Sequence, residues 1–364
     1  MALYHKWDVK NGFAFVLQFF SLISDGLGGV KHFIRKHFQL TPLMIAAYDG
    51  DLNFFQQARK KTFDPNQTLK KSVTSPIHLA AYGGNIELYR QLLQESDNKN
   101  NYGKHAITPL HYSAGMGHLE VFKLFHANAE VKNPKMTQRR REATPLHIAA
   151  DLGHLEICKF IIKKEGDKNP ADSNGGTPLH AAAHNGYIDI CRIIVDKLTN
   201  NNPEANNGFT PLHLAAVKGN IGICKLIMKN VIDKNPRNLD GNTPLHFAAW
   251  LGQVDVAEFI LKNINDKNPG NTAGITPLHW AAKKGFFDIC QLILNYLDEK
   301  NPLTDSGNTP LHFAAFGGHL NVCKLIMANI HDISPKNMVN NTPMDFAKKI
   351  NQIYVIQLFS LATI

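Results

Sequence analysis

A short motif recurs along this chain at intervals of 33 residues, and this period restricts the fold more than any other feature of the sequence. In the copy at residues 243–252 it reads Thr-Pro-Leu-His-Phe-Ala-Ala-Trp-Leu-Gly. From Thr144 onward the interval never varies, whereas the earlier intervals are 34, 33 and 36 residues. A unit of this size buries a core only by stacking on its neighbours, so the period predicts a solenoid. The copies start at Thr41, Ser75, Thr108, Thr144, Thr177, Thr210, Thr243, Thr276, Thr309 and Thr342.

Each position of the motif has a physical role. Thr243 is suited to cap a helix and Pro244 to occupy its first position. The alanine pair is small enough to let a second helix approach closely. Gly252 is placed to end the first helix in a left-handed conformation, and the apolar residues of 254–261 have the spacing of a second helix. Asp-Lys-Asn-Pro at 266–269 indicates a turn. We therefore expect a helix, a tight turn, a helix and an extended loop in each unit.

The Thr-Pro-Leu-His-x-Ala-Ala opening at this period resembles the ankyrin-repeat family, over about residues 31–364. The resemblance implies an all-α repeat solenoid, elongated and curved, built from stacked helix-turn-helix units with β-hairpin finger loops. It also implies a concave face that binds proteins.

The sequence departs from the family at two places. Family members usually carry Gly-Ala-Asp-Val-Asn after the second helix, and the glycine is replaced here, which leaves the end of that helix open. The last copy, residues 342–364, has Asp345 in place of histidine, as a degenerate polar cap should, and its final helix is expected near residues 353–361. The glycine position holds Leu198, Val231, Ile264 or Leu297.

The first 30 residues stand apart from the repeats. Residues 13–24 are strongly apolar and follow Lys6 and Lys10. We interpret residues 1–30 as a capping segment that covers the end of the array. Two alternatives stay open. One is a membrane anchor, although a transmembrane helix wants about 20 apolar residues. The other is a signal peptide, although no small-x-small cleavage site stands out.

Composition and cysteine spacing bound the class of protein. The chain is 44% hydrophobic and 19% charged, which fits a soluble folded protein. Its cysteines recur at one position of the repeat, and equivalent points on stacked helices lie roughly 8–10 Å apart, beyond the roughly 7 Å that a disulfide spans. We expect separate buried thiols in a reducing compartment, the cytoplasm or alternatively the nucleus. The cysteines are Cys158, Cys191, Cys224, Cys290 and Cys323.

The histidines of the motif could be mistaken for a metal array. Each repeat has one such histidine, and it lies too far from the histidine of the next repeat for both to bind one ion at Zn–N distances of about 2.0–2.1 Å. The family resemblance implies instead that each bonds near its helix start and to the neighbouring repeat. The sequence contains no G-x-x-x-x-G-K-[ST], G-x-S-x-G or C-x-x-C motif. We predict no catalytic site, cofactor or metal. The histidines are His78, His111, His147, His180, His213, His246, His279 and His312.

By resemblance, partner contacts come from the residue before the capping threonine and from the two residues before the closing glycine. These positions vary between copies while the motif around them does not. Clustered exposed apolar side chains are typical of binding hot spots. The alternative is that the finger loops fold over and bury them within the monomer. The candidates are Phe209, Val217, Trp250, Leu251, Ile275, Lys283 and Phe316.

A basic loop is a second candidate contact. The interval of 36 residues after Thr108 places three extra residues in residues 135–142, Lys-Met-Thr-Gln-Arg-Arg-Arg-Glu. This run suits an acidic partner or a nuclear-import patch, and the alternative is a solvated loop tip. No aromatic residues interleave with the run, which argues against nucleic acid. The residues concerned are Arg139, Arg140 and Arg141.

Together these patterns predict a non-enzymatic, monomeric scaffold or adaptor that binds a partner protein on a concave groove. The net charge of +9 permits an acidic partner without requiring one. Two other interpretations stay open. The chain could be a membrane-tethered or channel-associated adaptor anchored by residues 13–24. It could also be a substrate-recruiting adaptor or effector of a ubiquitin ligase, which rests on the breadth of the family alone.

Overall fold

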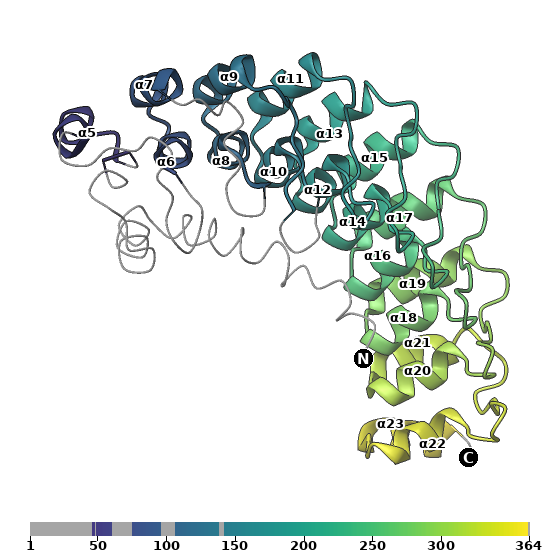
Figure 1. Cartoon of the computed structure of the whole chain (residues 1–364). Helices are drawn as coiled ribbons and strands as arrows, with labels where there is room; N and C mark the ends of the chain where they lie inside the picture. Colours follow the sequence, from purple (N-terminus) through teal and green to yellow (C-terminus); the bar gives the residue numbers. More distant parts are fainter. Residues whose placement is uncertain (1–45, 48, 60–74, 96–105, 138–141, 363–364) are drawn as a thin grey trace. The chain divides into compact units, whose positions relative to one another are not determined.

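The computed structural model describes residues 46–47, 49–59, 75–95, 106–137 and 142–362, and in these ranges the chain forms helices and no β-strand. It divides inside α12 into unit 1, up to Ala182, and unit 2, from Ala183. The helices alternate as first and second helices of successive repeats (Figure 1). This confirms the all-α repeat solenoid. The first helices are α6 (Pro76–Gly83), α8 (Pro109–Met116), α10 (Pro145–Leu152), α12 (Pro178–Asn185), α14 (Pro211–Lys218), α16 (Pro244–Leu251), α18 (Pro277–Lys284), α20 (Pro310–Gly317) and α22 (Pro343–Lys349). The second helices are α5 (Leu52–Arg59), α7 (Ile86–Glu95), α9 (Leu119–Asn128), α11 (Leu155–Lys164), α13 (Ile188–Val195), α15 (Ile221–Lys229), α17 (Val254–Asn263), α19 (Phe287–Tyr296), α21 (Leu320–Met327) and α23 (Ile353–Ala362).

From α6 to α20, each first helix begins at the motif proline and ends just before the motif glycine, whereas α22 ends at Lys349 without a glycine. Thr243 caps α16 in an extended conformation, and Pro244 takes the first helical position. Gly252 ends the helix at φ +77°, and its N–H donates to the Ala248 carbonyl. A β-carbon on Gly252 would come within 3.0 Å of the Phe286 ring, so glycine is needed both for its backbone conformation and for space.

At seven positions, the motif histidine joins the start of its own helix to the next repeat. The Thr243 N–H donates to His246 Nδ1 at 3.0 Å, so Nδ1 is the acceptor. The proton therefore sits on Nε2, which donates to the Ile275 carbonyl of the following repeat at 3.0 Å. One neutral tautomer thus caps its own helix and holds the next finger loop. The same pair of bonds is made by His78, His111, His147, His213, His279 and His312.

The second helix α17 ends without glycine because a lysine of the following Asp-Lys-Asn-Pro turn caps it. After α17, Ile264 is extended, and Lys267 Nζ donates to the carbonyls of Leu261 and Ile264. The neighbouring Asn268 accepts the N–H of Leu278 at 3.2 Å and so joins the turn to the next first helix. The family's glycine is dispensable here because a side-chain donor satisfies the last carbonyls.

The finger loops form tight turns rather than the expected hairpin strands. In one finger, the Asn238 N–H donates to the Asn242 carbonyl, and the Gly241 N–H donates back to Asn238. The next finger is attached by the Thr272 N–H, which donates to the Asp240 carbonyl at 3.0 Å. Successive fingers of unit 2 are therefore tied by backbone bonds, although each is too short to form a strand.

The five cysteines are buried and unpaired, as the spacing predicts. Burial raises the pKa of each thiol to about 12. They are small hydrophobic core residues.

At the end of unit 2, α23 coincides with the helix expected near residues 353–361. In α22, Asp345 accepts the Thr342 N–H at 2.9 Å but has no proton to donate onward at neutral pH.

No helix within the described ranges has the length and apolar character needed to cross a membrane. Residues 1–30, and with them the apolar run at 13–24, lie outside those ranges.

The buried histidines predict a loss of stability in mild acid. Burial lowers the pKa of His246 to about 3 and those of His111 and His279 to about 4, from an ordinary value of 6.5. The unfolded chain therefore binds more protons than the native one between pH 6.5 and about 4. The free energy of unfolding should be at its full value above pH 6.5. It should fall through this window by more than about 1 kcal/mol for each histidine.

Urea unfolding followed by circular dichroism at several pH values measures this effect. The double variant His246→Gln/His279→Gln removes two of the titrating groups and should show a shallower slope between pH 6.5 and 4. Asp345 does not interfere, because its pKa is lowered from 3.8 and its contribution is lost only below this window. A wild-type stability that is flat from pH 7 to 4 would contradict the role assigned to the histidines.

Candidate protein-binding surface

The first helices of unit 2 carry a row of aromatic side chains at one repeated position. The residue after the motif histidine, or after Asp345 in its place in α22, is aromatic in α16, α18, α20 and α22, which pack side by side in that order (Figure 1). Phe247 is 9% exposed, and the other three are half-buried. Three of the four rings pack edge-on against the histidine of the preceding repeat, at 5.1–5.8 Å between centroids. The row consists of Phe247, Trp280, Phe313 and Phe346.

Two tryptophans and two lysines form a compact group on this row, which we call the Trp–Lys cluster. Trp250 of α16 meets Trp280 of α18 edge to face, with ring centroids 4.4 Å apart. Lys284 Nζ lies 4.0 Å from the Trp250 ring centroid. Lys283 Nζ lies 5.3 Å from the centroid of Trp280 and 6.0 Å from that of Phe313. At these distances each ammonium group is attracted to the face of an aromatic ring.

The structure brings several of the predicted groove residues together. Trp250 and Lys283 belong to the Trp–Lys cluster, and Phe316 is 40% exposed and faces Phe346 at 6.3 Å. Phe209 is half-buried, and its ring centroid lies 5.1 Å from that of Phe247. The remaining three are half-buried and carry no aromatic ring: Val217, Leu251 and Ile275. The role of all seven in binding stays a prediction.

Sequence reasoning missed part of this surface. Trp280, Phe313 and Phe346 were not among the candidates, because the family resemblance directed attention to the positions near the closing glycine. Lys284 lies at one of those positions, directly before Gly285, but only Lys283 of that pair was named as a candidate. The signal for the three aromatic residues was nevertheless present: the fifth residue of the motif, counted from its threonine, is aromatic in every copy from residue 247 to residue 346. A period of 33 places such residues on one side of stacked helices.

The first-helix side of unit 2 is also basic. The helices α14, α16, α18 and α20 contain no acidic residue. In α22, the carboxylate of Asp345 is occupied by the N–H and hydroxyl of Thr342. Burial, followed by the adjacent Lys284 charge, lowers the pKa of Lys283. The lysines on this side are Lys218, Lys283, Lys284, Lys348 and Lys349.

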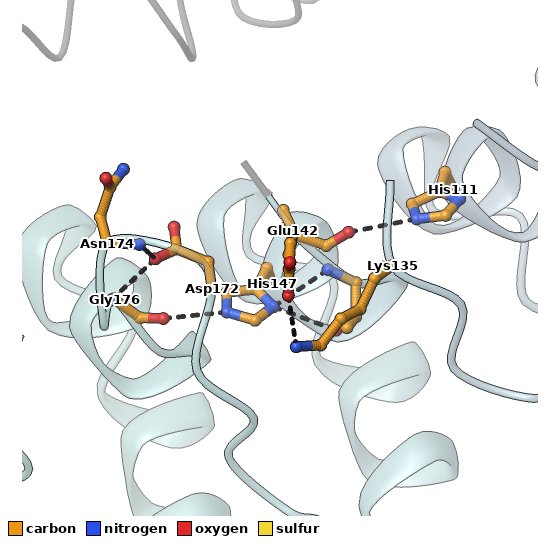
Figure 2. Close-up of polar contacts among 9 residues, drawn as sticks. His111, Lys135, Glu142, His147, Asp172, Asn174 and Gly176 are labelled. Atoms are coloured by element: carbon orange, nitrogen blue, oxygen red, sulfur yellow. Dashed lines mark hydrogen bonds and ion pairs between the residues drawn. The ribbon is translucent and has the colours of Figure 1, made fainter. Parts of the chain in front are cut away.

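The basic loop of unit 1 is held at both of its flanks. Figure 2 shows an ion pair between Lys135 Nζ and Glu142 Oε2, which are 2.7 Å apart. The Met136 N–H donates to the Ala143 carbonyl at 2.9 Å, and the same carbonyl accepts from His111 Nε2. The loop therefore leaves and rejoins the repeat at a fixed point. Arg139, Arg140 and Arg141 themselves lie outside the described residues.

The fold and the repeated contacts agree with a comparison against known families. The family model described as ankyrin repeats, three copies, matches residues 43–135, 124–203, 194–271 and 262–337. These matches run from residue 43 to residue 337 and cover most of the chain. The chain belongs to the ankyrin-repeat family. No curated protein gives a match to it.

In these ankyrin repeats the histidines hold the scaffold together. Both ring nitrogens of His246 are engaged, Nδ1 by Thr243 and Nε2 by Ile275, which leaves neither free to transfer a proton or bind a metal. Within the part of the chain that the structure describes, no three His, Cys, Asp or Glu side chains gather closely enough to hold a metal ion.

Substitutions should separate scaffold from surface among the aromatic residues of the ankyrin repeats. Phe247→Ala removes a nearly buried ring packed against Phe209 and His213 and is expected to cost about 3 kcal/mol in the free energy of unfolding. Phe316→Ala removes an exposed ring and should cost about 1 kcal/mol or less. Urea unfolding of both variants measures the difference, and equal costs would mean that Phe316 belongs to the core.

Proposed function

We propose that this protein is a non-enzymatic scaffold that binds a partner protein on the first-helix side of unit 2, centred on the Trp–Lys cluster. Ankyrin repeats are generally protein–protein interaction modules. The observation that carries the proposal is the aromatic row that continues over four repeats, with Trp250 half-exposed and Phe316 exposed at its edge. Contiguous apolar side chains on a folded surface mark interaction sites.

The composition of this surface supports binding more than packing. Tryptophan carries more binding energy per residue than most side chains because it buries a large area with few rotatable bonds. Trp250 and Trp280 are two of the three tryptophans in the chain, and they meet at one point of the surface. The scaffold beneath them is complete without a partner, since the histidines and glycines already satisfy the helix ends.

A rigid scaffold also favours affinity. The helices that carry the aromatic row are fixed to one another by the histidine bonds and by the backbone bonds between fingers. A partner therefore orders little of this chain on binding, and less conformational entropy is lost. The variable positions can change from repeat to repeat without disturbing these bonds, which suits a surface selected for one partner.

Affinity capture with the full chain tests the proposed function. The variant Trp250→Ala/Phe316→Ser removes two side chains of the surface, and we expect it to lose about tenfold or more in partner binding. Its melting temperature should change by only a few degrees, about 2–4 °C. Capture followed by mass spectrometry and differential scanning calorimetry measure the two effects.

The matched control is Ile232→Ser, which removes a fully exposed apolar side chain in the loop after the second helix α15. It should leave partner binding unchanged. If the partners captured by the double variant equal those of the wild type, this surface is not the binding site. A large fall in melting temperature with unchanged binding would place Trp250 in the core instead.

A further inference from the structure

The first helices of unit 2 differ from the second helices in their acidic residues. The first helices α14, α16, α18 and α20 contain no acidic residue, and lysines lie on α14 and α18. Among the second helices, α17 carries Asp255 and Glu258 and α19 carries Asp288, whereas α15 and α21 carry lysines alone. The lack of carboxylates on the helices that carry the Trp–Lys cluster is therefore a local feature and does not follow from the net charge of the chain alone.

Lys283 and Lys284 lack the acidic neighbour that Lys262 of the second helix α17 has. On α17, Lys262 Nζ lies 2.6 Å from Glu258 Oε1. Within the described residues, no carboxylate oxygen lies within 4.0 Å of Lys283 or Lys284 Nζ, and both ammonium groups lie over aromatic rings instead. Two like charges thus lie close enough to repel each other, one half-buried at Lys283 and one exposed at Lys284. An incoming anion would relieve this repulsion.

The rings around the lysines restrict what that anion can be. Each ammonium group has an aromatic face on one side, so a partner that contacts it also contacts Trp250, Trp280 or Phe313. An anion with apolar neighbours satisfies both kinds of contact. The first helices α14, α16, α18 and α20 contain no arginine, which is the side chain that matches phosphate bidentately. A carboxylate is therefore favoured over a phosphate.

The length of the partner segment follows from the repeat geometry. Trp250, Lys283 and Phe316 lie on three successive first helices that pack against one another. Packed helices are about 8–10 Å apart, so the three span roughly 20 Å, or about six residues of extended chain at 3.3 Å per residue.

We propose that the Trp–Lys cluster recognises an acidic, extended segment of another protein, in which carboxylates pair with Lys283 and Lys284 and apolar side chains pack on Trp250, Trp280 and Phe316. This rests on the proposed function and adds the chemistry of the partner. The segment alternates Asp or Glu with apolar residues, and it crosses the first helices α16, α18 and α20.

Three pools of synthetic peptides test the proposal against the full chain. Apolar residues Leu, Ile and Phe alternate with Asp/Glu in the acidic pool, with Asn/Gln in the neutral pool and with Lys/Arg in the basic pool. The background variant Trp7→Phe leaves Trp250 and Trp280 as the only tryptophans, so fluorescence reports on the cluster itself. We expect the acidic pool to change this fluorescence and to bind about tenfold or more tightly than the neutral pool, with the difference shrinking as salt rises from about 0.05 to 0.5 M.

Substitutions assign that preference to the two lysines. Lys283→Glu/Lys284→Glu should weaken binding of the acidic pool by about 10- to 100-fold, whereas Lys283→Met/Lys284→Met keeps the apolar stems and should mainly abolish the salt dependence. The control Lys229→Glu/Lys324→Glu changes the net charge by the same amount on exposed positions of the second helices α15 and α21 and should have little effect. Circular dichroism confirms that each variant is folded.

Several outcomes would overturn the proposal. These are no binding by the acidic pool, equal binding by the neutral or basic pool, or an equal loss in the control variant. Displacement of the acidic pool by a single-stranded oligonucleotide or by phosphatidylserine vesicles would show a general polyanion site instead. If partner capture depends on Trp250 and Phe316 but persists in Lys283→Glu/Lys284→Glu, the scaffold function stands and the acidic partner does not.

Discussion

The bond from a neutral histidine to the next repeat is the interaction on which the rest of the molecule depends. His246 must accept at Nδ1 from Thr243 and donate from Nε2 to Ile275, and a neutral imidazole does both across one ring. Asp345, at the same position of α22, can cap its helix but has no proton for the second bond at neutral pH. Burial keeps the His246 ring neutral, because a charged imidazole would be separated from water. A second proton on Nδ1 would also remove the acceptor for the Thr243 N–H. The stacking of the repeats thus depends on a proton on Nε2 of the histidine, and the hydrogen bond accepted by Nδ1 fixes the proton there.

Because these bonds join the repeats, the remaining positions of the first helices are not needed for the scaffold and can form a binding surface. Thr243, His246 and Gly252 satisfy the backbone at the two ends of α16, and the alanine pair fills the contact with neighbouring helices. The aromatic residue that follows each histidine has a double role. Phe313 packs on His279 and so supports the scaffold, but one side of its ring is left to face Lys283. Stability and recognition therefore meet in the same side chains along the row.

Most of the fold follows from the period, because each motif residue acts within its own repeat or on the next one. The start at Thr243, the end at Gly252 and the buried thiols are local consequences of residue type. The end of α17 could not be placed from sequence, since it depends on Lys267 reaching back from the following turn. The compartment also stays a prediction, because thiols as deeply buried as these are unreactive under either redox condition. For the surface, Trp250 and Phe316 occupy positions before the closing glycine that the family resemblance assigns to partner contacts. Trp280 follows the motif histidine, a position that the sequence analysis did not consider for binding.

The Trp–Lys cluster is where this division between scaffold and surface is most visible. Lys283 is half-buried and Lys284 is exposed, and the repulsion between the two adjacent charges adds to the cost of burying Lys283. Cation–π contacts with Trp250 and Trp280 offset part of that cost and hold the ammonium groups in fixed positions. Charges that are costly to the free protein but already oriented are well suited to a partner that neutralises them, since the partner then gains the attraction without having to order the side chains. The same four residues therefore combine a repulsion between neighbouring charges with a fixed aromatic frame, the arrangement on which the proposed carboxylate partner rests.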